Sequence, residues 1–454
     1  MESSKEILSM ASGRAIRYLE EIDKRGVAPT AQSVAGLAGF DKPLPEKPVT
    51  PSSVLSMLDD LVSPATMGMA GKRFFGFVIG GSLPVTLAAN WMAGAWDQNS
   101  ALYQVTPGTA HVEQVALRWL IELFGLPPET GGAFVTGATV ANFTALAAAR
   151  HVVLEREGWN VEADGLFGAP PITVVVGEEA HPSLIKSLGL LGMGRSRVKR
   201  VPTDGQGRMR ADAMPQLKGP TIVCAQAGNV NTGAFDPIES ICDKAHAAGA
   251  WAHIDGAFGL WASAVPTRAH LTKGIEKGDS WGTDAHKWLN VPYDSGLAFV
   301  RDREALRAAM AITAEYLPTE SDQRNPADYT PELSRRARGV EVWAALMSLG
   351  RSGVHDLIER TCLHAMRFAD GLRSAGYHIL NDVVLNQVLV SFGNPERTHR
   401  VIDAIQADGT CWCGGTVWHG ETAMRISVSS WATTEDDVER SLEAIVRCAK
   451  KVLR

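Results

Sequence analysis

Two short segments of this sequence hold the residues best suited to chemistry. In the first, Gly249–Ala252 leads into His253-Ile254-Asp255, which has the apolar character of a buried strand ending in a carboxylate. In the second, Ser280–Asp284 resembles a neighbouring strand and runs into His286-Lys287, so that the lysine follows Asp255 by thirty-two residues. An aspartate and a lysine at the ends of neighbouring strands are typical of enzymes that use pyridoxal phosphate (PLP). There the lysine holds the cofactor as a Schiff base and the aspartate holds the proton on the pyridine nitrogen.

A phosphorylated cofactor also needs a site for its phosphate group. The stretch Phe134–Asn142 predicts a strand, a turn that contains Gly137, and the start of a helix. A small residue such as Ala138 lets backbone N–H groups approach an anion, the helix dipole favours that anion, and Thr139 adds a hydroxyl donor. An ordinary helix cap without a ligand has the same pattern. The aspartate and the lysine in the same predicted sheet favour phosphate binding.

Two further loops follow predicted strands. His181 comes after the strand near Val176, where an imidazole can lie on the cofactor ring and donate a proton, although a histidine in a loop is often a helix cap. In Asn229–Thr232, Asn231 could bind the phenolic oxygen of the cofactor, or these side chains could only shape the turn. Gly189–Gly194 resembles a dinucleotide fingerprint, but its glycine order is wrong and it follows a helix, so it predicts no nucleotide site.

Short β-rich runs alternate with helical stretches over most of the chain. The expected strands are residues 132–135, 172–176, 197–201, 221–225, 251–255, 280–284 and 297–300. This alternation, with continuously apolar strands, predicts an α/β fold: a mostly parallel seven-stranded sheet with helices on both faces. Sites in such folds lie at the carboxyl ends of the strands, which is where Asp255 and Lys287 fall.

The sequence predicts three regions. Residues 1–55 contain an apolar helical stripe followed by a proline-rich extended connector, so we expect an N-terminal arm that packs on a partner subunit. Residues 56–310 form the expected large cofactor-binding domain. Residues 311–454, where helices precede short strands, form a smaller C-terminal α+β domain.

Composition excludes several classes of protein. The chain has 44 Lys plus Arg and 50 Asp plus Glu, with no clustered basic surface, so we expect neither a nucleic-acid partner nor a membrane partner. No stretch approaches the length of a transmembrane span, and the polar N-terminus lacks the apolar core of a signal peptide. The six scattered cysteines, with Cys411 and Cys413 one residue apart, fit no metal or redox motif. We therefore expect reduced thiols, no metal and a cytoplasmic location.

The chain resembles the PLP-dependent amino acid decarboxylases of the aromatic-amino-acid, glutamate and histidine decarboxylase group. The matching features come in the family's order: Phe74–Gly81, Trp96–Asn99, Thr136–Asn142, His181, Asp255, His286-Lys287 and Ser334-Arg335-Arg336. The resemblance implies the aspartate aminotransferase fold (PLP fold type I) and a homodimer with active sites at the subunit interface.

The resemblance also implies a role for each matching residue. Lys287 carries the cofactor, Asp255 pairs with its ring nitrogen, Ala257 lies beneath the ring and His181 above it, and Ala138, Thr139 and His286 bind the phosphate. A tyrosine on a mobile loop donates a proton to Cα in the family, and Tyr329 is the matching position. A tyrosine packed on the small domain is the alternative interpretation of that residue.

Two departures from the family pattern are visible. Aromatic-specific members have bulky apolar residues where this chain has Asn99–Leu102, so an aromatic substrate is not favoured. The turn at residues 136–139 also has one glycine fewer than the usual form.

The function that the sequence favours is decarboxylation of an L-amino acid through a Lys287 Schiff base and a quinonoid intermediate, with release of carbon dioxide and an amine. Aldehyde-forming decarboxylation, retro-aldol cleavage of a phosphorylated substrate and transamination remain alternatives, because the same lysine and aspartate serve them. A non-catalytic protein is disfavoured, since it would be free to lose both residues. The sequence does not identify the amino acid.

Overall fold

The computed structural model describes residues 2–312 and 323–453. Its chain forms two compact units. The sheet unit consists of Ser82–Leu363 and Asn381–Gln387, and the terminal unit consists of Met1–Gly81, His364–Leu380 and Val388–Arg454. In this division the N-terminal residues group with C-terminal ones and residues 323–363 group with the large sheet, whereas the predicted regions divide at residues 55 and 310.

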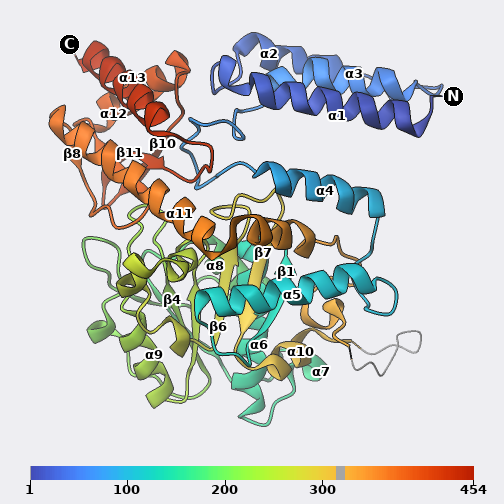
Figure 1. Cartoon of the computed structure of the whole chain (residues 1–454). Helices are drawn as coiled ribbons and strands as arrows, with labels where there is room; N and C mark the ends of the chain where they lie inside the picture. Colours follow the sequence, from blue (N-terminus) through green and yellow to red (C-terminus); the bar gives the residue numbers. More distant parts are fainter. Residues whose placement is uncertain (1, 313–322, 454) are drawn as a thin grey trace. The chain divides into compact units, whose positions relative to one another are not determined.

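The sheet unit is built on seven strands in the order β1-β7-β6-β5-β4-β2-β3 (Figure 1). Their bounds are β1 Gly131–Val135, β2 Thr173–Gly177, β3 Lys199–Val201, β4 Thr221–Gln226, β5 Trp251–Asp255, β6 Ser280–Asp284 and β7 Gly296–Val300. Only β7 runs against its neighbours, and the other adjacent pairs are parallel. The prediction of a mostly parallel seven-stranded sheet is confirmed, and each predicted strand agrees with an observed one to within two residues at either end.

Helices cover both faces of this sheet. The helices of the sheet unit are α4 Pro84–Trp96, α5 Pro107–Phe124, α6 Ala138–Glu155, α7 Val161–Asp164, α8 Pro182–Leu190, α9 Ile238–Ala247, α10 Arg303–Met310 and the first part of α11 Gly339–Ser374. The alanine-rich α6 packs on one face, where its small side chains join those of β1 and β7 in a fully buried core. The opposite face is closed by α5, whose Phe124 ring meets Trp261 and Phe299 edge to face. A helix that is apolar on nearly all sides, as α6 is, belongs in such an interior.

The terminal unit combines N-terminal helices with a small sheet. Its elements are α1 Ser4–Glu21, α2 Ala31–Gly36, α3 Pro51–Leu61, α12 Pro395–Asp408, α13 Glu435–Leu453 and the four-stranded sheet β10-β11-β9-β8, formed by Gly414–Trp418, Glu421–Ser427, Gln387–Ser391 and His378–Ile379. The predicted N-terminal helix is present and begins with a capping box between Ser3 and Glu6. The connector expected to be extended instead contains α2, which Thr30 caps through its side chain.

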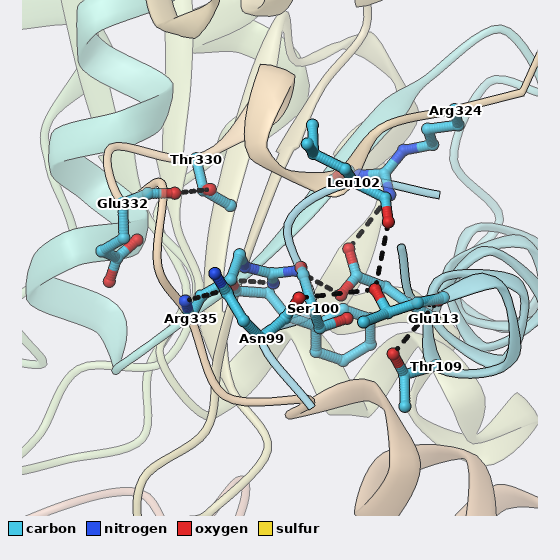
Figure 2. Close-up of polar contacts among 12 residues, drawn as sticks. Asn99, Ser100, Leu102, Thr109, Glu113, Arg324, Thr330, Glu332 and Arg335 are labelled. Atoms are coloured by element: carbon cyan, nitrogen blue, oxygen red, sulfur yellow. Dashed lines mark hydrogen bonds and ion pairs between the residues drawn. The ribbon is translucent and has the colours of Figure 1, made fainter. Parts of the chain in front are cut away.

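One buried ion pair joins distant segments of the sheet unit (Figure 2). Arg335 donates through Nη1 to Glu113 Oε2 at 2.7 Å and to the carbonyl of Ser100 at 2.8 Å, and through Nη2 to the carbonyl of Phe134 at 2.9 Å. Arg324 donates to the other oxygen of Glu113 at 3.0 Å. Through Arg335 and Arg324, the carboxylate on α5 therefore links the loop around residue 100, the strand that precedes the predicted phosphate site, and the segment 324–335.

We expect Arg335→Leu to lower the free energy of unfolding by about 3–5 kcal/mol, because it leaves the buried Glu113 charge without its closest partner. Urea unfolding followed by tryptophan fluorescence measures this change. Arg351→Leu is the matched control, since it breaks an exposed ion pair with Glu122 in the same unit and should cost less than about 1 kcal/mol. Equal losses in both variants would contradict the importance given to the buried pair.

Candidate active site

The carboxyl ends of β1 and β6 bring a lysine, a carboxylate and a helix N-terminus together. Lys287 follows β6, and its Nζ lies 2.9 Å from Oδ2 of Asp284, the last residue of that strand. The other oxygen of Asp284 accepts a hydrogen bond of 2.6 Å from the backbone N–H of Ala138, at the start of α6. Asp284 was not predicted as a site residue, although its position at the end of a predicted strand next to the lysine indicates one.

The turn that leads into α6 lies very close to the neighbouring strand β7. A Cβ atom on Gly296 would lie 2.4 Å from the Cα of Gly137, so only glycine fits at position 296. The same turn approaches His286, because a Cβ on Gly137 would lie 3.2 Å from the ring of that histidine. The glycine pair thus brings the predicted phosphate-binding turn within reach of the residues that follow β6.

His286 is oriented as a neutral donor. Its Nδ1 accepts a 3.0 Å hydrogen bond from the backbone N–H of Ser295, so the proton of the neutral ring is on Nε2, which lies 3.5 Å from Asp284 Oδ1. Burial lowers the pKa of His286, against the opposing effect of Asp284. The ring also stacks on Tyr293, with 4.2 Å between the ring centroids.

These donors fit the phosphate of PLP. The backbone N–H of Ala138 donates to an anionic oxygen, Oδ1 of Asp284. Nε2 of His286 lies 3.5 Å from the same oxygen atom. Thr139 is the second residue of α6, where its hydroxyl is available to an anion at the helix N-terminus. The structure therefore brings together the three residues predicted to bind phosphate.

Asp255 is buried at the end of β5. Its Oδ2 accepts from Asn142 Nδ2 at 3.1 Å, and its Oδ1 accepts from the N–H of Ala257 at 3.3 Å. Burial raises the pKa of Asp255, while the charges of His181 and Lys287 and the two donors oppose that rise. A buried carboxylate of this kind is stabilised by a cationic partner, such as a protonated ring nitrogen. Ala257 lies between the two aspartates, because its carbonyl accepts from the N–H of Asp284 at 2.9 Å.

His181 lines a small cavity together with Asp255. It also caps α8, because its Nδ1 accepts from the N–H of Ser183 at 3.2 Å. Helix capping and a role in the site are thus compatible for this residue. The N–H of Asn231 donates to Asn229 Oδ1 at 2.8 Å, which supports the turn-shaping interpretation of that loop. A contact between the Asn231 side chain and the cofactor stays a prediction.

Within one protomer Tyr329 lies away from these residues. Its role as proton donor stays a prediction, because the active sites are expected at the subunit interface. Tyr329 is buried under Arg324, whose guanidinium is 4.4 Å from the ring centre and donates to the carbonyl of Gly132 near the start of β1. Lys287 follows the far end of β6, two strand spacings (about 10 Å) across the sheet and about 10 Å along it. The rest of the predicted lid, residues 313–322, lies outside the described residues.

The described residues contain no group of three His, Cys, Asp or Glu side chains arranged to hold a metal ion. Their helices include none long and apolar enough to cross a membrane.

Comparisons with known proteins identify the family of this chain. The pyridoxal-dependent decarboxylase conserved domain matches residues 35–393. Tryptophan decarboxylase 1 of Oryza sativa is 25% identical over 86% of this chain and 83% of its own length. The acidic amino acid decarboxylase GADL1 of Bos taurus is 30% identical over 63% of this chain and 57% of its own length. The crystal structure of Oryza sativa TDC with PLP and tryptamine superposes with a TM-score of 0.91, at 21% identity over 99% of this chain and 98% of that one. The chain therefore belongs to the pyridoxal-dependent decarboxylase family, as a PLP-dependent carboxy-lyase with PLP fold type I.

Proposed function

We propose that this protein removes the α-carboxylate of an L-amino acid as carbon dioxide and releases the amine, with PLP held by Lys287. The observation that supports this most directly is the cluster formed by Lys287, Asp284 and the N–H of Ala138. Asp255 lies on the adjacent strand β5, where it pairs with Gly282, two residues before Asp284. PLP, when bound, supplies the conjugated ring that accepts the electrons left at Cα.

Each residue of the site then has a distinct task. Lys287 binds the cofactor through its amine, and the carboxylate of Asp284, 2.9 Å from that nitrogen, holds or accepts a proton there. Asp255 stabilises the proton on the ring nitrogen. Ala138, Thr139 and His286 donate to the phosphate. Because the histidine donates as a neutral ring, it adds no charge of its own next to Lys287.

His181 is the candidate for returning a proton to Cα. It lines the same cavity as Asp255, and its Nδ1 accepts from Ser183, which leaves Nε2 as the nitrogen that carries the proton of the neutral ring. In the same protomer Tyr329 packs against Arg324 near the start of β1, so we favour His181 for this step.

The substrate class is less constrained than the reaction. The relatives named above include a tryptophan decarboxylase and an acidic amino acid decarboxylase, so family membership does not decide between side chains. The segment Asn99–Leu102 has one bulky apolar side chain, that of Leu102, and Arg335 fixes its backbone at Ser100. We therefore favour a non-aromatic amino acid. A cytoplasmic location is part of the proposal and agrees with six free, buried cysteines among the described residues.

Carbon dioxide release from each of the twenty amino acids and common analogues tests the proposed reaction. Lys287→Ala should abolish release, because no other amine holds the cofactor, and borohydride should label wild-type protein on the peptide that contains Lys287. Lys277→Ala, which removes an exposed lysine paired with Asp243, is the control and should leave both results unchanged. Aldehyde or keto acid in place of amine would support the alternative chemistries.

We expect Asp255→Asn to reduce turnover by several orders of magnitude while the cofactor stays bound. An amide cannot hold the ring nitrogen in its protonated form, so the ring accepts electrons poorly. Steady-state kinetics on the preferred substrate and the absorbance of the bound cofactor measure the two effects separately. Turnover close to that of the wild type would exclude this role.

Tyr329→Phe should keep the carbon dioxide release and amine yield of the wild type, since the structure places its ring against Arg324. Product analysis by chromatography checks this outcome. A sharp fall in amine, with cofactor content and unfolding midpoint unchanged, would restore Tyr329 as the proton donor.

A homodimer is also part of the proposal. On α4 four large apolar side chains are exposed, namely Val85 at 39%, Trp91 at 40%, Met92 at 53% and Trp96 at 46%. Met92 and Trp96 border an apolar hollow of about 530 Å³ between α4, α5 and α11. In the terminal unit, α1 buries none of its residues and exposes Leu8 and Ile16. Apolar surface of this extent marks an interaction site, and a second copy of the chain is the partner that the family resemblance implies.

We expect Met92→Glu to shift the protein from dimer to monomer, because a charge at the centre of this face would be buried unpaired in the interface. Sedimentation velocity gives the mass. Leu190→Glu on α8, also an exposed apolar position, should leave the dimer intact. A wild-type monomer that is fully active would contradict the dimer.

A further inference from the structure

A row of buried polar side chains runs behind Asp255, between the sheet and α6. Asn142 donates through Nδ2 to Asp255 Oδ2 at 3.1 Å, and its Oδ1 lies 3.0 Å from Nε2 of His253. Nδ1 of His253 lies 2.9 Å from the hydroxyl of Ser280, which also accepts from Trp251 Nε1 at 2.9 Å. All five residues are buried, so water does not substitute for any of these partners.

The chemistry of the groups allows one consistent direction for these hydrogen bonds. An ionised carboxylate only accepts, so the amide nitrogen of Asn142 faces Asp255 and the amide oxygen faces His253. His253 must then donate through Nε2, and in a neutral ring Nδ1 is left to accept from Ser280. Ser280 in turn accepts from the indole N–H of Trp251, which can only donate. Every bond therefore points its proton towards Asp255.

Two other features match this arrangement. A Cβ on Gly282 would lie 2.6 Å from Asn142 Oδ1, so the glycine of β6 leaves the space that the amide needs. Trp251, His253 and Asp255 alternate along β5 and share the face that α6 covers. Burial lowers the pKa of His253 to about 3, which keeps its ring neutral.

Other titratable groups also face Asp255. They are His181 before α8, Lys287 after β6 and Cys224 on β4. The first two favour the charged carboxylate. Burial raises the pKa of Cys224 well above its usual range, so it stays a neutral thiol. The only donors to the Asp255 carboxylate among the described hydrogen bonds are thus Asn142 and the N–H of Ala257.

We propose that Asn142 and His253 are positioning residues for the reaction proposed above, on which this inference rests. The row of hydrogen bonds from Trp251 to Asn142 keeps Asp255 ionised and fixes its rotation, so that the carboxylate is ready to pair with the cofactor's ring nitrogen. His253 acts only through Asn142, whose amide it orients.

The test is a pH titration of the absorbance of bound PLP in the purified enzyme, which requires no turnover. Asn142→Leu removes a donor to a charged group, so Asp255 should lose its charge at higher pH, and the acid-side midpoint should rise by about one pH unit or more. His253→Phe should move it in the same direction by a smaller amount. Thr144→Val is the control on the same helix, since its buried hydroxyl has no hydrogen-bond partner among the described residues, and it should leave the midpoint unchanged.

An unmoved midpoint in both Asn142→Leu and His253→Phe would overturn the proposal, as would an equal shift in Thr144→Val. Should Asn142→Leu fail to fold, Ser280→Ala removes the next link with a smaller change in volume and should give a small upward shift. The titration is independent of the proposed reaction. A wild type that binds PLP but releases no carbon dioxide would refute decarboxylation and leave the midpoint test standing, whereas an active wild type with unmoved variants would refute the positioning role alone.

Discussion

The desolvation of two carboxylates at one edge of the sheet is the constraint on which the rest of the site depends. Asp255 and Asp284 end adjacent strands and are both buried, and a buried charge is tolerated only where donors or cations surround it. Lys287 and the N–H of Ala138 compensate Asp284, while Asn142 and Ala257 donate to Asp255. The buried charges of these two carboxylates therefore depend on the start of α6, on the two glycines beside it and on the register of β5 with β6.

Much of the fold could be predicted because its signals are local. Short β-rich runs alternating with helical stretches predicted all seven strands of the large sheet. The positions of Asp255 and Lys287 at strand ends predicted the cofactor. The residues that contact Asp255 and Ala138 from behind were not predicted, because these contacts are distant in sequence. Asn142 and His253 are 111 positions apart, and Ala138 and Asp284 are 146 positions apart. The alternation of Trp251, His253 and Asp255 on one strand face was the available clue that these residues act together.

The segment around Tyr329 and the N-terminal connector both follow a course that the local sequence does not specify. Prolines around Tyr329 correctly predicted irregular structure, but local sequence does not say which edge of a sheet a loop follows. That choice depends on Arg324, which reaches the carbonyl of Gly132 across 192 residues of chain. The N-terminal connector was likewise read from its prolines, although Thr30 caps a short helix within it. Composition indicates where regular secondary structure ends, whereas long-range polar contacts determine the course of the chain after that point.

The ion pair of Glu113 with Arg335 has a consequence for the order of synthesis and folding. The two residues are 222 positions apart, so closing the chain between them carries a large entropic cost that only later contacts repay. A nascent chain that has not yet exposed Arg324 and Arg335 cannot neutralise the carboxylate that α5 and β1 enclose. Completion of the sheet unit is thus delayed until most of the polypeptide has left the ribosome.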